Sequence, residues 1–142
     1  MATITLARKF RFEAAHRLNK HKGQCKHLHG HTYKGHVEIE GPVGEDGMVL
    51  DFQNMKALLN MSIGLLDHSL MLHENDELVN VMADHDQHVV TMPYDPTVEN
   101  LSKRIGLSIQ KYLNEDETLD AWVKRVVLYE TPNCWAIWRP VE

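Results

Sequence analysis

The chain has 142 residues, of which 43% are hydrophobic and 25% charged, and a formal net charge of −5 at neutral pH. These values predict a single globular domain over residues 1–142 and exclude a disordered chain, a collagen-like repeat and a disulfide-stapled mini-protein. The acidic balance also argues against binding nucleic acid or an anionic membrane through bulk charge, so that any attraction for an anionic ligand has to be local.

The cellular compartment is predicted from what the sequence lacks. The segment from Met1 to Arg11 has no apolar run typical of a signal peptide, and no stretch approaches the ~18 apolar residues of a membrane span. The two cysteines, Cys25 and Cys134, lie far apart in the sequence, which favours reduced thiols. We therefore expect a cytoplasmic protein.

Two strands are expected in the first third of the chain. Apolar and polar residues alternate over residues 3–17, which predicts a strand with one buried face, and His16 falls on that face. A loop is expected over residues 18–28, and the alternation resumes in a second strand over residues 29–40.

Helices are expected next, followed by two more strands. Asp51 is the predicted N-cap of a helix that reaches about residue 66, and Thr97 is the predicted N-cap of a second helix over residues 98–114. The segment between them is polar, with only a weak helical pattern. Alternation returns over residues 121–130, and a closing strand is expected over residues 135–139. This order indicates an α+β fold in which helices cover one face of an antiparallel sheet.

A metal site is suggested by histidines near the first two strands. His29 and His31 flank Gly30, so on a strand both imidazoles point to the same side and can reach one ion. If the two strands pair, His16 becomes a third ligand. Three histidines with an open fourth position are typical of a catalytic zinc. The alternative is a set of solvated histidines on an edge strand.

The role of Cys25 is left open by its spacing. It could be a fourth ligand that closes a structural zinc site together with His27 or the other histidines. It could instead be a reactive thiolate, activated by the metal and by Lys22 or Lys26, that acts as a base or nucleophile. An inert buried thiol is the third possibility.

Other acidic and basic side chains give weaker signals. Asp67 and His68 follow the first helix. An acid next to an imidazole is a common arrangement for proton transfer. The alternative is that His68 lies at the C-terminus of the helix, where the helix dipole favours a histidine. Glu130 shares the parity of apolar residues in its strand, so it is either a carboxylate at the edge of the core or a surface residue. His85 and His88 are expected to be solvated.

Six ordered motifs resemble the 6-pyruvoyl-tetrahydropterin synthase / 6-carboxy-tetrahydropterin synthase family. This resemblance implies the tunnelling fold, a four-stranded antiparallel sheet with two long helices on one face, whose subunits assemble into a barrel-forming trimer or a hexamer. The motifs are Phe10-x-Phe12-x-Ala14-Ala15-His16-Arg17-Leu18, Cys25-x-x-x-His29-Gly30-His31, Leu50-Asp51-Phe52, Leu66-Asp67-His68, Pro96-Thr97-x-Glu99-Asn100 and Glu130-Thr131.

The resemblance also implies a role for each candidate residue. Zn²⁺ is the implied cofactor, and 7,8-dihydroneopterin triphosphate is the implied small-molecule substrate. Arg17 and Lys20 are candidates for contacting the triphosphate. The implied roles are zinc ligands for His16, His29 and His31, catalytic base for Cys25, proton relay for Asp67 and His68, and substrate binding for Glu130 and Thr97.

Within the family, the spacing after the cysteine is a guide to the product. Three residues separate Cys25 from His29, which favours the 6-carboxy-tetrahydropterin synthase of the 7-deazaguanine (queuosine) route, which releases acetaldehyde and triphosphate. The segment over residues 69–93 is longer than in the shortest members and lacks a Leu-Asn pair that often follows the Asp-His pair. The alternatives are a 6-pyruvoyl-tetrahydropterin synthase, a non-catalytic zinc-binding protein closed by Cys25, and a hydrolase that uses zinc-bound water.

Overall fold

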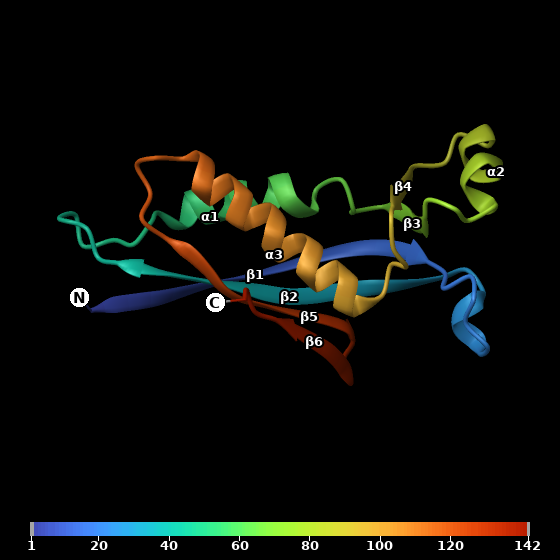
Figure 1. The fold of residues 1–142 in the computed structure, drawn as a ribbon, viewed down its shortest axis with the longest axis horizontal. Helices are drawn as coiled ribbons and strands as arrows, with labels where there is room; N and C mark the ends of the chain where they lie inside the picture. The colour runs from blue at the N-terminus through green and yellow to red at the C-terminus, as the bar shows by residue number, and fades with distance from the viewer. Residues whose placement is uncertain (1, 142) are drawn as a thin grey trace.

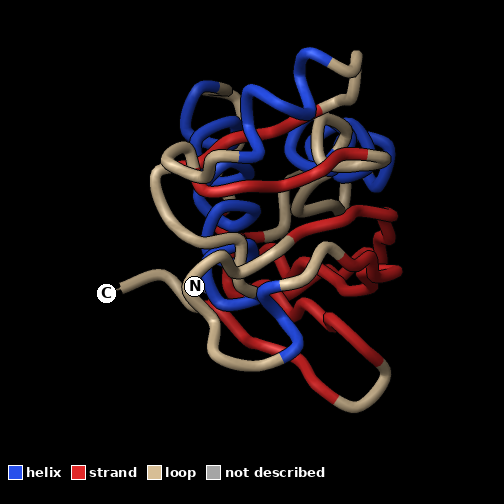
Figure 2. Tube along the Cα trace, turned by 90° about the vertical axis from the view of Figure 1, so that its right-hand side faces the viewer, coloured by secondary structure: helices blue, strands red, loops and turns tan. Residues whose placement is uncertain are grey.

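The computed structural model describes residues 2–141, and these form one six-stranded sheet in the order β4-β3-β1-β2-β5-β6 with helices packed against it (Figure 1). In the view turned by 90°, the strands form a curved rather than a flat sheet (Figure 2). The elements are β1 (Thr3–His16), the one-turn helix η1 (Gln24–Lys26), β2 (His29–Pro42), α1 (Phe52–Ile63), β3 (Ser69–His73), α2 (Leu78–Asp84), β4 (Val89–Met92), α3 (Val98–Glu115), β5 (Trp122–Thr131) and β6 (Cys134–Trp138).

The antiparallel part of the sheet consists of the four strands that the sequence predicts. β1 and β2 pair along their whole length, from Thr3 opposite Pro42 to His16 opposite His29. β2 pairs with β5 and β5 with β6, both antiparallel. The α+β class and the antiparallel pairing of these four strands are therefore confirmed.

The expectation of a four-stranded, purely antiparallel sheet is wrong, because β3 and β4 extend the sheet and make it mixed. β3 runs parallel to the end of β1, with Ser69 opposite Ala14, and β4 runs parallel to β3. These strands have only five and four residues. Strands of this length are too short for an alternation of apolar and polar residues to be detected. In addition, β3 carries a continuous apolar run because it is buried between two neighbouring strands.

Both predicted helix starts are confirmed by their caps. The Asp51 carboxylate accepts a hydrogen bond from the backbone N–H of Gln53 at 2.8 Å, and the Thr97 hydroxyl accepts one from Asn100 N–H at 3.1 Å. Such contacts satisfy backbone N–H groups that have no partner inside the helix. α1 ends at Ile63, earlier than the predicted residue 66, and the chain then turns into β3.

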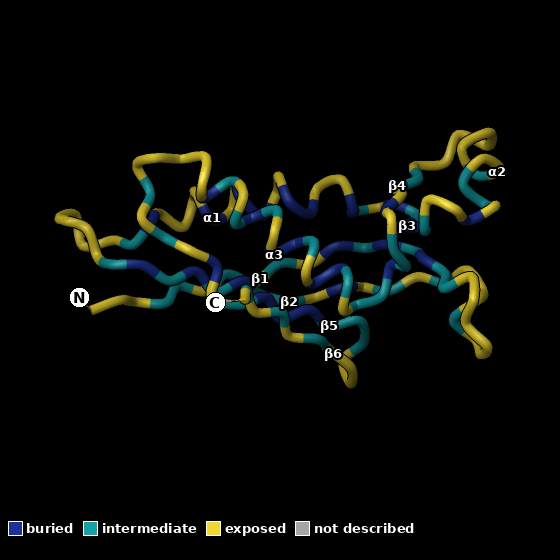
Figure 3. The backbone as a smooth tube through the Cα atoms, in the orientation of Figure 1, coloured by how far each residue is buried: buried dark blue, intermediate teal, exposed yellow. Residues whose placement is uncertain are grey.

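The core lies between the sheet and the two long helices, α1 and α3 (Figures 1 and 3). α3 packs against β5 and β6, and α1 packs against β1 and α3. On the inward face of β1 and β2 the Phe12 and Tyr33 rings stack with centroids 4.8 Å apart. Exposed residues gather at the loops and at α2. This packing fixes the ends of β1 and β2 where the histidines lie. No helix within residues 2–141 is long and apolar enough to span a membrane.

An ion pair connects the end of β1 to the segment that contains α2. The Arg17 guanidinium donates to both oxygens of Asp76, with Nε 2.8 Å from Oδ2, and the Asp76 side chain is only 1% exposed. Asp76 Oδ1 also accepts the backbone N–H of Leu78 at the start of α2. Arg17, a sequence candidate for contacting triphosphate, is therefore engaged by a buried carboxylate.

Replacing Asp76 with Ala is expected to destabilise the fold by roughly 3 kcal/mol, because the partly buried Arg17 charge loses its partner and the Leu78 N–H loses its acceptor. The contact with Arg17 also holds the pKa of Asp76 below its usual range. This carboxylate stabilises the parent protein at pH values above its ordinary pKa of ~4, and the contribution is lost as pH falls through the lower native pKa.

Urea unfolding at neutral pH and in acid measures both effects. The variant should unfold at lower urea than the parent at pH 7, and the difference should shrink in acid. Asp84→Ala, at an exposed position of α2, is the matched control. Equal unfolding midpoints for the Asp76 and Asp84 variants at pH 7 would contradict the structural role of the pair.

Candidate metal centre

Three histidines and one carboxylate meet where β1 ends and β2 begins. The strand register places His16 opposite His29 and Ala14 opposite His31, so the three imidazoles share the inward face. The Nε2 atoms of His16 and His29 are 3.1 Å apart, and Glu130 Oε1 lies 3.2 Å from Nε2 of both His16 and His31. All four donor atoms lie within 4.8 Å of one another.

Backbone carbonyls orient two of these rings. His16 Nδ1 lies 2.7 Å from the carbonyl oxygen of Pro96, and His29 Nδ1 lies 2.7 Å from that of His27. A carbonyl oxygen only accepts, so each Nδ1 carries the proton and each neutral ring presents its Nε2 lone pair to the cluster. Two lone pairs at this distance repel unless a proton or a metal ion lies between them.

The chemistry of the donor set fits a metal ion. Burial lowers the pKa of His31, which disfavours a proton there, and His31 Nε2 has no hydrogen-bond partner among residues 2–141. The contact between Glu130 and His16 holds the pKa of Glu130 below its usual range, so that the Glu130 carboxylate is charged. Tetrahedral Zn–N bonds of ~2.0–2.1 Å place two nitrogens about 3.3 Å apart, close to the separations in this cluster. Imidazole and carboxylate donors suit zinc and other divalent transition metals.

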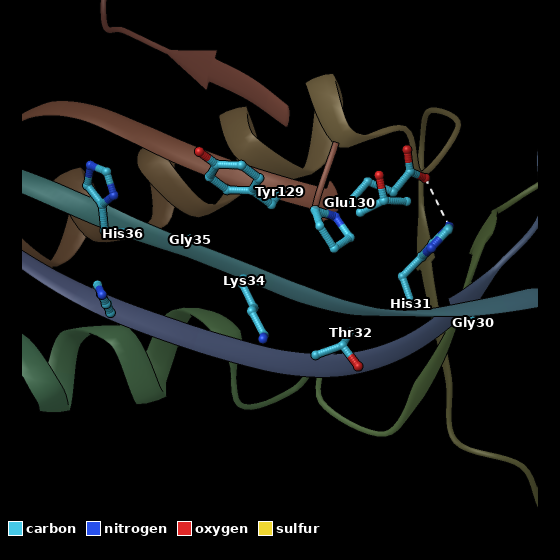
Figure 4. A pocket seen from close by; sticks show the side chains of 11 residues that line it. Gly30, His31, Thr32, Lys34, Gly35, His36, Tyr129 and Glu130 are labelled. Atoms are coloured by element: carbon cyan, nitrogen blue, oxygen red, sulfur yellow. Dashed lines mark ion pairs between the residues drawn. The ribbon is translucent and has the colours of Figure 1, made fainter. Parts of the chain in front are cut away.

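Glu130 is the residue whose position the sequence described least well. Its strand parity leaves two alternatives, a carboxylate at the edge of the core or a surface residue, and suggests no place for it beside the histidines. The structure puts it at the edge of the core, with its side chain 25% exposed. β5 pairs with β2 only as far as Lys34 opposite Tyr129. The next residue, Glu130, turns inward and its carboxylate joins the cluster, as the dashed contact to His31 shows (Figure 4).

Cys25 lies outside this donor group in the structure of residues 2–141. It sits in η1, in the connection between β1 and β2, and is partly buried. Its carbonyl accepts the backbone N–H of Leu18 at 2.8 Å, which folds the connection back toward the end of β1. Because Glu130 supplies the fourth donor of the cluster, Cys25 is not needed to complete it.

Asp67 and His68 do contact each other, although adjacency in sequence did not require it. Asp67 Oδ2 lies 3.0 Å from His68 Nδ1, and Asp67 Oδ1 accepts the backbone N–H of Glu13 at 2.8 Å. The latter bond lowers the pKa of Asp67, with a further contribution from His68. His68 is 79% exposed and lies beyond the end of α1 at Ile63, so the helix-dipole interpretation is wrong. An exposed imidazole held by an acid remains able to exchange protons.

The structure also places Thr97 and the two histidines expected to be solvated. The Thr97 hydroxyl is used as the cap of α3, and the neighbouring Pro96 carbonyl is the one that orients His16. This carbonyl, like that of His27, leaves no signal in the sequence, because any residue supplies one. His85 and His88 are exposed and belong to no donor cluster in the described chain, as expected.

A cavity of about 670 Å³ adjoins the cluster. It lies along β2 and the end of β5, with His31 and Glu130 at one end (Figure 4). From there it follows β2 past Thr32 and Lys34 to His36 and Tyr129. The volume is in the range of small-molecule sites. The arrangement can therefore hold a small ligand against a metal ion.

Comparisons with known proteins agree on one family. The family model described as 6-pyruvoyl tetrahydropterin synthase matches residues 5–141. A 6-carboxy-5,6,7,8-tetrahydropterin synthase from Rickettsia bellii is 33% identical over 136 residues, which cover 93% of this chain and 97% of that protein. A relative from Archaeoglobus fulgidus, named a putative enzyme of the same activity, is 36% identical over 126 residues, or 88% of this chain and 86% of its own length.

Solved structures show the same fold at lower identity. An uncharacterised protein from Wolinella succinogenes has a TM-score of 0.80 at 20% identity, with 98% of this chain and 99% of that chain covered. A mutant of the Plasmodium vivax 6-pyruvoyltetrahydropterin synthase has a TM-score of 0.79 at 22% identity, with 99% of both chains covered.

Proposed function

The chain belongs to the 6-pyruvoyl tetrahydropterin synthase family, and we propose that it is a zinc-dependent 6-carboxy-5,6,7,8-tetrahydropterin synthase of the 7-deazaguanine (queuosine) route. In this reaction 7,8-dihydroneopterin triphosphate and one water give 6-carboxy-tetrahydropterin, acetaldehyde and triphosphate. The convergence of three imidazoles and one carboxylate beside a ligand-sized cavity carries the proposal. The names of the sequence relatives support the choice of product.

In this proposal the histidines His16, His29 and His31 hold the zinc, which when bound supplies a Lewis acid for the side-chain hydroxyls of the substrate. The Pro96 and His27 carbonyls keep two of these rings in the tautomer that can bind metal. Cys25, in the η1 turn between β1 and β2, acts as the general base.

The remaining roles follow from the position of each side chain. Asp67 fixes the exposed His68 ring, which passes protons between the substrate side chain and solvent. Glu130 accepts the amide N–H and the exocyclic amine of the pterin ring and leaves the histidine cluster when it does so. Thr97 lies beside the Pro96 carbonyl and contributes to the substrate pocket.

The quaternary and cellular setting belongs to the same proposal. We infer a single pterin synthase-like domain that acts in the cytoplasm as a homo-oligomer, a trimer or a hexamer, with sites built between subunits. Supporting this, β4 and β6 are edge strands of the sheet, and pairing with a second copy protects such edges.

The alternatives are separated by one product assay. Incubating the zinc-loaded protein with 7,8-dihydroneopterin triphosphate should release triphosphate and acetaldehyde in equal amounts, together with a carboxylated pterin. Triphosphate without acetaldehyde would show the 6-pyruvoyl activity instead. Release of neither, with zinc retained, would indicate a non-catalytic zinc protein.

Glu130→Gln should weaken pterin binding by ~1–3 kcal/mol, or roughly ten- to a hundred-fold, because the amide leaves one pterin donor unpaired in a desolvated pocket. Zinc affinity should fall as well, since the substitution replaces a charged donor of the cluster by a neutral one. Calorimetric titration with dihydroneopterin and measurement of zinc content check the two effects.

The control for this change is Glu115→Gln, at an exposed position at the end of α3. It should match the parent in both measurements. Parent-like pterin affinity in Glu130→Gln would show that another group anchors the ring.

A further inference from the structure

A buried tyrosine hydroxyl lies behind the metal centre and has no part in the proposed reaction. Tyr33 is fully buried and belongs to the hydrophobic core. Its ring stacks on that of Phe12, with an angle of 11° between the two planes. A phenylalanine ring would fill the same space, so packing alone does not explain why the core contains a hydroxyl at this position.

The hydroxyl needs a hydrogen-bond partner because it is shielded from water. A buried hydroxyl without a partner destabilises a fold, since it gives up its hydrogen bonds to water for nothing in return. Within residues 2–141, the polar atom at hydrogen-bond distance from the Tyr33 hydroxyl is Nδ1 of His16, 3.3 Å away. The hydroxyl is therefore spent on a candidate metal ligand.

The strand register explains how Tyr33 reaches the metal centre. Tyr33 is the third inward-facing residue of β2, after His29 and His31, and it lies opposite Phe12 of β1. The Tyr33 ring meets the rings of His16 and His31 at 88° and 77°, with centroids 6.1 and 5.5 Å away. Tyr33 thus forms the wall between the histidine cluster and the hydrophobic core.

The contact gives the Nδ1–H group of His16 a second acceptor. The Pro96 carbonyl oxygen lies 2.7 Å from Nδ1, and the Tyr33 oxygen lies 3.3 Å from the same nitrogen. One N–H group shared between two acceptors is a three-centre hydrogen bond. Both oxygens carry partial negative charge, which raises the basicity of the imidazole and strengthens the bond that its Nε2 makes to a metal ion.

The two acceptors are held by different parts of the fold. Pro96 belongs to the connection between β4 and α3. Tyr33, in contrast, is fixed inside the sheet by the pairing of β2 with β1 and by its stacking on Phe12. Close packing leaves such a side chain little room to move. The hydroxyl therefore ties the His16 ring to β2, the strand that carries the other two histidines.

We propose that Tyr33 is a positioning residue of the metal centre, whose hydroxyl fixes the tautomer and the orientation of the His16 ring. The inference rests on the proposed function, since it assumes that His16 binds zinc. Tyr33 acts through His16, because its side chain is fully buried and does not line the cavity beside the cluster.

Tyr33→Phe tests the role of the hydroxyl because it keeps the ring and its stacking. The dissociation constant for zinc, measured by competition with a chromophoric chelator, should rise about ten-fold. This is the lower end of the ~10–100-fold loss that follows removal of an outer hydrogen-bond partner of a metal ligand, because the Pro96 carbonyl remains. In the metal-free variant, the nitrogen NMR signal of His16 Nδ1 should shift from its position in the parent.

Tyr112→Phe is the matched control, since it removes a hydroxyl from a partly buried ring of α3 that packs against the core. It should bind zinc like the parent. A purely structural role of the Tyr33 hydroxyl would change the urea midpoint of the metal-free protein and leave zinc affinity unchanged. Parent-like zinc affinity in Tyr33→Phe would therefore overturn the inference, whereas failure of the parent itself to bind zinc would refute the metal site of the proposed function.

Discussion

Replacing His29 with alanine should leave a folded protein that no longer retains a stoichiometric zinc ion. Within residues 2–141, three nitrogen donors converge in the cluster, and the His29 Nε2 is 3.1 Å from that of His16. Loss of an outer hydrogen-bond partner of a metal ligand already lowers affinity ~10–100-fold, so loss of the ligand itself should exceed this range. Turnover should fall with the zinc content.

The fold should survive because His29 is only partly buried at the start of β2 and is absent from the hydrophobic core. Zinc content after dialysis, together with circular dichroism, measures both parts of the expectation. His85→Ala, at an exposed position outside the cluster, should retain both zinc and activity. Full zinc stoichiometry in His29→Ala would contradict the assignment of the three histidines.

Substitution of Cys25 by alanine should separate chemistry from binding. Its position in η1 lies outside the four-donor cluster within the described residues, so zinc and pterin affinity should match those of the parent. Turnover should fall ~10²–10⁴-fold, the usual contribution of a positioned acid or base. Single-turnover kinetics, zinc analysis and pterin titration measure the three quantities.

The second cysteine supplies a matched control. Cys134 is exposed at the start of β6, and Cys134→Ala should leave turnover unchanged. If Cys25→Ala loses zinc instead of activity alone, the thiolate is a metal ligand and a structural zinc site becomes the better description.

Much of the fold could be predicted from the alternation of apolar residues in the strands and from the N-caps of the helices. Long strands with one buried face alternate clearly, as β1 does, and helix starts at Asp51 and Thr97 carry side chains that bind their own backbone. β3 and β4 could not be predicted in this way. They are short, and their strand character comes from pairing, of β3 with the distant end of β1 and of β4 with β3, rather than from their own pattern.

The candidate site could likewise be predicted only in part. His29 and His31 are predicted to share a face by strand geometry alone, and His16 joins them once β1 and β2 pair. The position of Glu130 beside them depends on where β5 leaves β2, which is a tertiary feature. Backbone carbonyls that orient the rings, and the bond between Asp67 and His68, depend on local conformation that residue types do not specify.

Zinc titration of the metal-stripped protein tests whether the histidine cluster holds the metal on which turnover depends. The protein is treated with a chelator, dialysed, and assayed with 7,8-dihydroneopterin triphosphate as zinc is added back. We expect no acetaldehyde or carboxylated pterin without metal, and a linear rise in activity that ends at one zinc per chain. Full activity of the stripped protein, or no activity at any zinc content, would contradict it.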